Sequence, residues 1–252
     1  MEIADIEKID TVKIAKMIMD KLGVPYSAAQ EAKLLKPKGA TLAKTLSDIE
    51  SIEQTWKLED VDDQHSYGRK QAGEAILLWS VPPKSAQVLE NLVVLTGAKT
   101  VLEIGTSAGY AALHLAHGAS MNEGQVYTVE LLKEKSELAA ENFKRSGSAN
   151  VTLINGEASK VLKSSNNGKI DLVFLDADKE NYGGYLDLLL PLMNVGGLIV
   201  ADNINDYGHM MEDYLQKVSG THLPNSRTEH RVKSYYLAAL DNGLMITKKV
   251  SD

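Results

Sequence analysis

The second half of the chain repeats one pattern: a short apolar, β-branched segment, a turn, and a longer segment of mixed polarity. The apolar segments cover residues 101–104, 126–130, 151–155, 170–175 and 198–201. Helix-like segments lie between them at residues 108–116, 133–146, 159–162 and 181–190. Strands that alternate with helices are typical of a doubly wound α/β fold. We therefore expect a Rossmann-like, mainly parallel sheet.

The C-terminal end follows a different pattern. Residues 235–240 and 244–247 are β-rich, and Asp241-Asn242-Gly243 separates them. Asn-Gly is a strong signal for a hairpin turn. The hairpin would add two antiparallel strands to the five parallel ones, so we expect a seven-stranded sheet.

Residues 1–78 are predicted to form a helical extension and residues 79–252 the α/β domain. Asp10 or Thr11 can cap a helix that runs to Leu22, with Gly23 and Pro25 ending it. We expect the extension to cover the cleft of the second domain or to pair two subunits.

The rest of the extension reads as helical but polar from residue 41 to about residue 79, with a loop at 60–65. The sequence Val81-Pro82-Pro83-Lys84 then breaks the chain. Ser85 can cap a helix that continues through Leu95 and is closed by Gly97. Trp79 precedes the break and is a candidate wall of a substrate cleft or a helix-packing residue.

Composition excludes several classes of function. A net charge of −7 disfavours general affinity for nucleic acid or anionic membranes. Without cysteine there is no disulfide, thiol nucleophile or Cys-ligated zinc. No apolar run approaches the roughly 20 residues of a membrane span, and the acidic start lacks the order of a signal peptide. We expect a cytoplasmic location and no nucleic-acid or membrane partner.

A glycine turn follows the first predicted strand. Gly105 and Gly109 allow the backbone to approach a ligand closely, and the helix after them offers free amides. The spacing G-x-x-x-G is not the dinucleotide fingerprint, because Ser107 stands at the second glycine's place. Glu130, at the end of the next strand, can accept both hydroxyls of a ribose. The alternative is a simple strand–helix turn with a solvated glutamate.

Two further strands end in polar residues. Asp176, Asp178 and Lys179 follow residues 170–175, and Asp202-Asn203 follow residues 198–201. Carboxylate and amide oxygens suit Mg²⁺ or Ca²⁺, and a lysine can act as a base once its pKa is lowered. The alternative is that these residues cap the following helices. The histidines show no metal-ligand spacing, and His114 and His117 are expected at a helix surface or end.

Residues from about 79 to 249 resemble the metal-dependent O-methyltransferases that use S-adenosylmethionine, a family that includes catechol and caffeoyl-coenzyme A O-methyltransferases. The resemblance rests on several blocks in the same order: VPPKSAQVL, VLEIGTSAGYAALHLA, VYTVEL, VTLINGEA, IDLVFLDADKENYGGY, GGLIVADN and DNGLMITKK. It implies a class I methyltransferase fold for this part of the chain.

The resemblance also implies roles for single residues. The metal, Mg²⁺ or else Ca²⁺ or Mn²⁺, would be bound by Asp176, Asp202 and Asn203, and Lys179 would be the base, with Asp176 also counted as catalytic. S-adenosylmethionine would contact Val81, Glu103, Gly105, Thr106, Ser107, Tyr110, Glu130, Leu131, Ala158, Asp176, Asp178 and Tyr185.

The implied reaction is O-methylation of a small aromatic vicinal diol of the catechol, hydroxycinnamoyl or flavonoid type, by a homodimer. Ala111 stands where the family often has a serine, and Tyr236 lies near a glutamate position of the mammalian catechol enzyme. These departures affect the expected substrate. Two alternatives stay open: a Rossmann-type nucleotide-binding oxidoreductase, and a catalytically silent methyltransferase-like partner protein.

Overall fold

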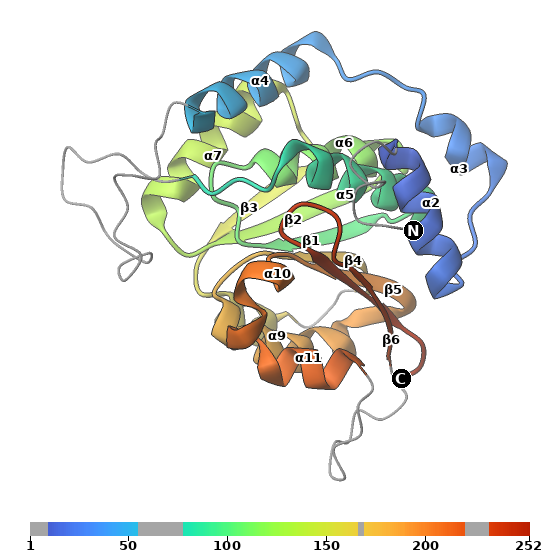
Figure 1. The fold of residues 1–252 in the computed structure, drawn as a ribbon. Coiled ribbons are helices and arrows are strands. Elements are labelled where there is room, and N and C mark those ends of the chain that lie inside the picture. Colours follow the sequence, from blue (N-terminus) through green and yellow to red (C-terminus); the bar gives the residue numbers. More distant parts are fainter. Residues whose placement is uncertain (1–9, 55–77, 166–168, 220–231) are drawn as a thin grey trace.

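The computed structural model describes residues 10–54, 78–165, 169–219 and 232–252 (Figure 1). Its centre is a seven-stranded sheet in the order β3-β2-β1-β4-β5-β7-β6. Pairing is parallel from β3 through β5 and antiparallel for β5 with β7 and β7 with β6. The strands are β1 (Thr100–Ile104), β2 (Gln125–Glu130), β3 (Val151–Asn155), β4 (Ile170–Leu175), β5 (Met193–Ala201), β6 (Val232–Leu237) and β7 (Leu244–Lys249). The predicted fold class is confirmed.

Helices cover both faces of this sheet (Figure 1). One face carries α2 (Thr11–Leu22), α4 (Ala40–Gln54), α5 (Pro83–Thr96), α6 (Tyr110–Ser120) and α7 (Lys133–Ser146). The other carries α8 (Ala158–Ser164), α9 (Tyr182–Leu189), α10 (Ile204–Tyr207) and α11 (Glu212–Ser219). Shorter elements are α3 (Ala28–Lys33) and the 3₁₀ turns Lys179–Asn181, Leu190–Leu192 and Gly208–Met210. Two hydrophobic cores therefore enclose the sheet, one on each side.

The N-terminal helix has the predicted limits. The Asp10 side chain accepts a hydrogen bond from the amide of Val12, and Gly23 ends the helix in the left-handed conformation. Ile14, Ile18 and other apolar residues of α2 are buried, and α2 packs against α5. The apolar face of α2 is thus covered within the chain itself. Among the described residues, no helix is long and apolar enough to cross a membrane.

The long polar helix expected for residues 41–79 is only partly testable. α4 ends at Gln54, and the predicted loop at 60–65 lies outside the described residues, as do all of residues 55–77. Trp79 is not helical, since its φ is +47°. The division between residues 78 and 79 stays a prediction.

Three local predictions were wrong. Ser85 does not cap its helix: α5 begins at Pro83 with Pro82 before it, because a proline without an amide donor fits the first turn. β6 ends at Leu237, so the hairpin connection is longer than the Asn-Gly signal implied. β5 begins at Met193, since pairing with β4 extends the strand beyond its apolar segment.

Candidate active site

Three loops meet at the carboxyl edge of the sheet because their strands are neighbours. The Asp176 amide donates to the carbonyl of Ile104 at 3.0 Å, and the Asp202 amide donates to the carbonyl of Leu175 at 3.1 Å. These bonds continue the parallel pairing of β1 with β4 and of β4 with β5. The two aspartates and the Gly105 turn therefore lie side by side, where an open α/β sheet presents its ligand site.

The Asp202 carboxylate is buried without a full set of partners. The residue is 1% exposed, and its Oδ1 accepts no hydrogen bond from any described residue. Burial and the nearby charge of Asp176 raise the pKa of Asp202 well above its usual range. A cation bound by these carboxylates would pair the orphan oxygen and remove the repulsion.

Asn203 follows in the left-handed conformation, with φ 66° and ψ 26°. Asparagine tolerates this region better than most residues. Together with Asp176 and Asp202 it supplies oxygen donors of the kind that Mg²⁺ and Ca²⁺ prefer. The described part of the chain has no group of three or more His, Cys, Asp or Glu that could hold a metal. A cation here would thus use two carboxylates and one carboxamide, and would keep positions open.

Lys179 lies in the same cluster. Its Nζ is 2.5 Å from Asp176 Oδ1 and donates to the hydroxyl of Tyr182 at 3.1 Å. Tyr182 is fully buried, and its hydroxyl donates to the carbonyl of Leu175 at 3.0 Å. The tyrosine therefore fixes the amine at the edge, where it can exchange a proton with a bound hydroxyl group.

The turn after β1 has the geometry that the glycines predicted. Gly105 has φ +100°, and a Cβ there would lie 2.0 Å from the carbonyl oxygen of Asp176. Gly109 has φ +85°, and a Cβ there would lie 2.5 Å from the ring of Phe143. Side chains are excluded at both positions, because Asp176 and Phe143 already occupy the space that a Cβ would need.

Glu130 joins this turn to the end of β2. Its Oε2 accepts from the amide of Ser107 and its Oε1 from the amide of Leu132, both at 2.8 Å. A carboxylate oxygen has two lone pairs. Glu130 can therefore accept two further hydroxyl groups while it holds the turn.

Glu103 is fully buried in β1. Its carboxyl group accepts from the hydroxyl of Thr128, which also bonds Thr106, while its Oε1 has no partner among the described residues. Burial, together with the charges of Asp176 and Glu130, raises the pKa of Glu103 well above its usual range.

The other predicted cofactor residues differ in exposure. Tyr185 is buried and donates to Asp178 Oδ1 at 2.6 Å. Val81 and Ala158 are also buried, whereas Leu131 is 63% exposed. Leu131 directly follows β2, Ala158 is the first residue of α8, and Tyr185 lies within α9.

Tyr110 begins α6, and its side chain contacts the N-terminal segment. Its hydroxyl donates to Glu50 of α4, and its ring centroid lies 5.1 Å from that of His114. The N-terminal segment therefore packs directly behind the turn.

Sequence reasoning missed two residues near the site. Tyr182 gave a weak signal, since it lies three residues after Lys179, one helical turn away. Lys135 gave none: it is buried, and its Nζ lies 4.9 Å from the ring centroid of Trp79, which is half exposed. This contact depends on two segments far apart in sequence.

The expectation of a helix surface or end was wrong for His114, whereas His117 lies in the last turn of α6 as expected. His114 is buried, and both His114 and His117 contact the Glu90 carboxylate through Nδ1, at 2.7 and 2.8 Å. Lys38 is 2.7 Å from the same carboxylate. Burial by itself would raise the pKa of Glu90, but these three partners outweigh it and hold the pKa well below its usual range. The cluster joins the N-terminal segment to α5 and α6.

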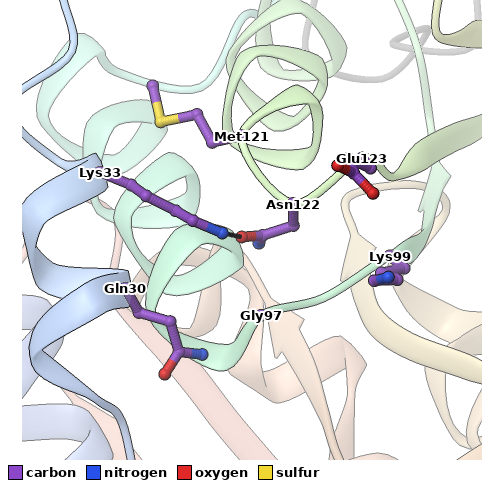
Figure 2. Close-up of a pocket in the computed structure, with 7 residues that line it drawn as sticks. All are labelled: Gln30, Lys33, Gly97, Lys99, Met121, Asn122 and Glu123. Atoms are coloured by element: carbon purple, nitrogen blue, oxygen red, sulfur yellow. Dashed lines mark hydrogen bonds between the residues drawn. The ribbon is translucent and has the colours of Figure 1, made fainter.

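A separate pocket of about 270 Å³ lies at the amino ends of the strands (Figure 2). Its lining comes from α3 and from the turns before β1 and β2: Gln30, Lys33, Gly97, Lys99, Met121, Asn122 and Glu123. None of the candidate site residues is among them. Figure 2 shows Lys33 pointing to Asn122, to which it donates a hydrogen bond at 2.9 Å.

Known proteins resemble the chain in sequence. It is 40% identical over 124 residues to Catechol O-methyltransferase of Mycobacterium tuberculosis, a match that covers 48% of this chain and 56% of that protein. It is 34% identical over 153 residues to Tricin synthase 2 of Oryza sativa subsp. japonica, covering 58% and 49%. The chain thus spans about half the length of these curated relatives.

The fold has solved counterparts. The O-methyltransferase from Bacillus cereus in complex with SAH superposes with a TM-score of 0.63 at 24% identity, over 85% of this chain and 93% of that one. Residues 66–250 match the model of a family described as O-methyltransferase, which confirms the resemblance drawn from the sequence blocks. Because that match covers well over half of this chain, the chain belongs to the O-methyltransferase family.

Proposed function

We propose that the protein transfers the methyl group of S-adenosylmethionine to a hydroxyl group of a small aromatic vicinal diol, with the help of a divalent metal. The observation that carries the proposal is the buried carboxylate of Asp202 beside Asp176, whose Oδ1 has no partner among the described residues. Two neighbouring acids at the open edge of an O-methyltransferase sheet are costly in the absence of a cation. A binding role explains why they are there.

The metal would be held by Asp176, Asp202 and Asn203. Mg²⁺ is the first choice, with Mn²⁺ or Ca²⁺ as alternatives, since all three donors are hard oxygens. When bound, such an ion acidifies an oxygen that coordinates it and orients a diol through two adjacent oxygens.

S-adenosylmethionine would lie along the Gly105 turn. Glu130, which holds this turn through the amide of Ser107, supplies two acceptors for ribose hydroxyls. Leu131, Ala158, Asp178 and Tyr185 are proposed as further contacts. When bound, the cofactor supplies a methyl group that leaves its sulfur for the attacking oxygen in line, so alignment is the main task of the protein.

Lys179 is proposed as the group that takes the hydroxyl proton. Its Nζ is fixed by Asp176 and by the buried hydroxyl of Tyr182, so it reaches the edge without large side-chain motion. A fixed base of this kind contributes 10²–10⁴-fold to a rate in typical enzymes.

An aromatic diol is proposed as the substrate because the names of several relatives refer to aromatic compounds of this kind. They include catechol O-methyltransferases, Tricin synthase 2 and caffeoyl-CoA O-methyltransferases. The exposed rings of Trp79, Tyr207 and Tyr236 are suited to such a substrate, because aromatic groups stack on one another.

Labelled methyl transfer tests the proposal. Catechols, hydroxycinnamoyl esters and flavonoids would be offered with S-adenosylmethionine, once with Mg²⁺ and once with chelator. We expect transfer that the chelator abolishes and Mg²⁺ restores. Transfer that ignores the chelator would contradict the metal role, and cofactor binding without transfer to any diol would support the silent-partner alternative.

A homodimer is also proposed, on family analogy alone. Size-exclusion chromatography with light scattering on the full chain measures it. Because α2 already packs against α5, we expect any dimer contact to use other surfaces, and a truncation of residues 1–40 to lower stability rather than only the mass of the assembly.

A further inference from the structure

Asn205 connects the edge that carries Asn203 to the loop between β6 and β7. Its Nδ2 donates to the carbonyls of Ala238 at 3.0 Å and Asp241 at 3.3 Å. Its Oδ1 accepts from the hydroxyl of Tyr236. All three partners are more than 30 residues away in sequence. The side chain therefore serves the distant loop and not its own helix.

The backbone at the same point is bonded to the same loop. The amide of Ile204 donates to the carbonyl of Gly243 at 3.2 Å, and the amide of Asn205 donates to that of Asn242 at 2.9 Å. α10 has only four residues, too few for a helix to be stable by itself. The left-handed turn at Asn203 is thus held by these tertiary bonds.

The loop is in turn anchored to α5. The carboxylate of Asp241 accepts from the amide of Ser85 at 3.1 Å and from its hydroxyl. Gly243 has φ +78°, and a Cβ there would lie 2.4 Å from Asn205 Oδ1. Loop and asparagine are fitted closely, so that a displacement of one is passed to the other.

Tyr236 lies at the same edge. Tyr236 and Ala201 both pair with Met245, so Tyr236 is two strands away from the residue that precedes Asp202. Two strand spacings are about 10 Å, within the span of an aromatic substrate. The tyrosine is 42% exposed, while its hydroxyl is oriented by Asn205.

We propose that Asn205 is a positioning residue with two roles. It fixes the turn that presents Asn203, and it orients the hydroxyl of Tyr236 toward the diol. The inference rests on the proposed function of this edge. It predicts that one side chain controls both metal affinity and substrate affinity.

The test compares Asn205→Ala, Tyr236→Phe, the double variant and Asn194→Ala. Asn194 is the control, since its Nδ2 likewise donates two hydrogen bonds, to the carbonyl of Lys169 and the carboxylate of Asp171, but at the opposite end of β5. Mn²⁺ affinity is measured by titration calorimetry without cofactor or substrate, and KM and kcat by methyl transfer. Circular dichroism checks folding.

We expect Asn205→Ala to weaken Mn²⁺ binding about tenfold, as is usual for residues that orient metal ligands, and to raise KM for the diol. Tyr236→Phe should raise KM while Mn²⁺ affinity stays within about twofold. In the double variant the KM effect should be no larger than in Asn205→Ala, since the two residues act as a pair. Asn194→Ala should match the wild type in both.

Two results would overturn the inference: Mn²⁺ affinity and KM unchanged in Asn205→Ala, or KM effects that add fully in the double variant. A wild type that binds no Mn²⁺ would instead contradict the proposed function. Amide hydrogen exchange then tests whether Asn205 holds the turn at Asn203. The amides of Ile204 and Asn205 should exchange faster in Asn205→Ala than in Asn194→Ala, and equal protection would reject the positioning role.

Discussion

Gly105 and Asp176 meet backbone to backbone: a Cβ built on Gly105 would lie 2.0 Å from the carbonyl oxygen of Asp176. The glycine turn proposed for the cofactor and the loop proposed for the metal are thereby fitted to each other. The amide of Asp176, bonded to Ile104, fixes the loop from the other side. A side chain at residue 105 must therefore displace the backbone of Asp176.

Gly105→Ala should abolish cofactor binding and destabilise the fold. The new Cβ meets backbone, which cannot move as a flexible side chain can, and φ +100° is unfavourable for alanine. Gly147→Ala is the control: φ is +74°, but no atom lies within 4 Å of the new Cβ. We expect the free energy of unfolding, measured in urea, to fall by about 1 kcal/mol in the control. In Gly105→Ala it should fall by at least twice as much. Equal losses would contradict the close fit.

Asp202→Asn should separate function from stability. The raised pKa of Asp202 means that burying this carboxyl group costs stability at neutral pH, where the unfolded chain ionises it freely, and asparagine removes that cost. We expect the melting temperature to stay level or rise by about 2–4 °C, while Mn²⁺ affinity and methyl transfer fall at least tenfold. Asp171→Asn should instead lower the melting temperature and leave Mn²⁺ affinity and methyl transfer unchanged, since Asp171 accepts hydrogen bonds from the amides of Lys99 and Thr100. A destabilised but active Asp202→Asn would reject the ligand role.

Lys179→Met should lower kcat by roughly 10²–10⁴-fold, because it removes the proposed base and keeps most of the side-chain volume. Cofactor affinity, measured by calorimetry, should not change. Lys44→Met is the control, since Lys44 is exposed on α4 and pairs only with Asp48 there. More than a tenth of wild-type kcat in Lys179→Met would show that another group takes the proton.

Stability should fall in acid partly through the cluster around Glu90. Burial lowers the pKa of His114 from 6.5, so the unfolded chain takes up a proton below about pH 6.5 that the folded chain resists. The depressed pKa of Glu90 adds stability that is full above pH 4.5 and is lost as pH falls toward its folded pKa. Both pKa shifts, that of His114 and that of Glu90, therefore stabilise the fold at neutral pH relative to acid. The difference in unfolding free energy between wild type and Glu90→Gln should therefore shrink below pH 4.5.

His114→Gln tests the other half of that prediction. It should remove the part of the pH dependence between pH 6.5 and 4.5, because glutamine does not titrate. Denaturant titrations at closely spaced pH values measure both variants. A pH slope in this window equal to that of the wild type would contradict the assignment.

Local sequence patterns were enough to predict most of the strands and several of the helices that flank them. β3, β4 and α7 have the predicted limits, since apolar periodicity and flanking turn residues act within a few residues. The ends of β5 and β6 were misjudged because neighbouring strands decide how far pairing extends. Asp176, Asp202 and Gly105 could be found for a related reason: parallel strands present their carboxyl ends on one side.

The sequence by itself determined the fold class, the family and the edge at which polar residues gather, because periodicity, turn residues and ordered blocks are carried by short stretches of chain. Only the tertiary structure decided that one oxygen of Asp202 has no partner among the described residues, that Asn205 bonds a loop more than 30 residues away, and that His114 is buried against Glu90. Burial and partnership depend on segments that meet only after folding. They set the charge and orientation of the side chains, and through these the chemistry that the edge can support.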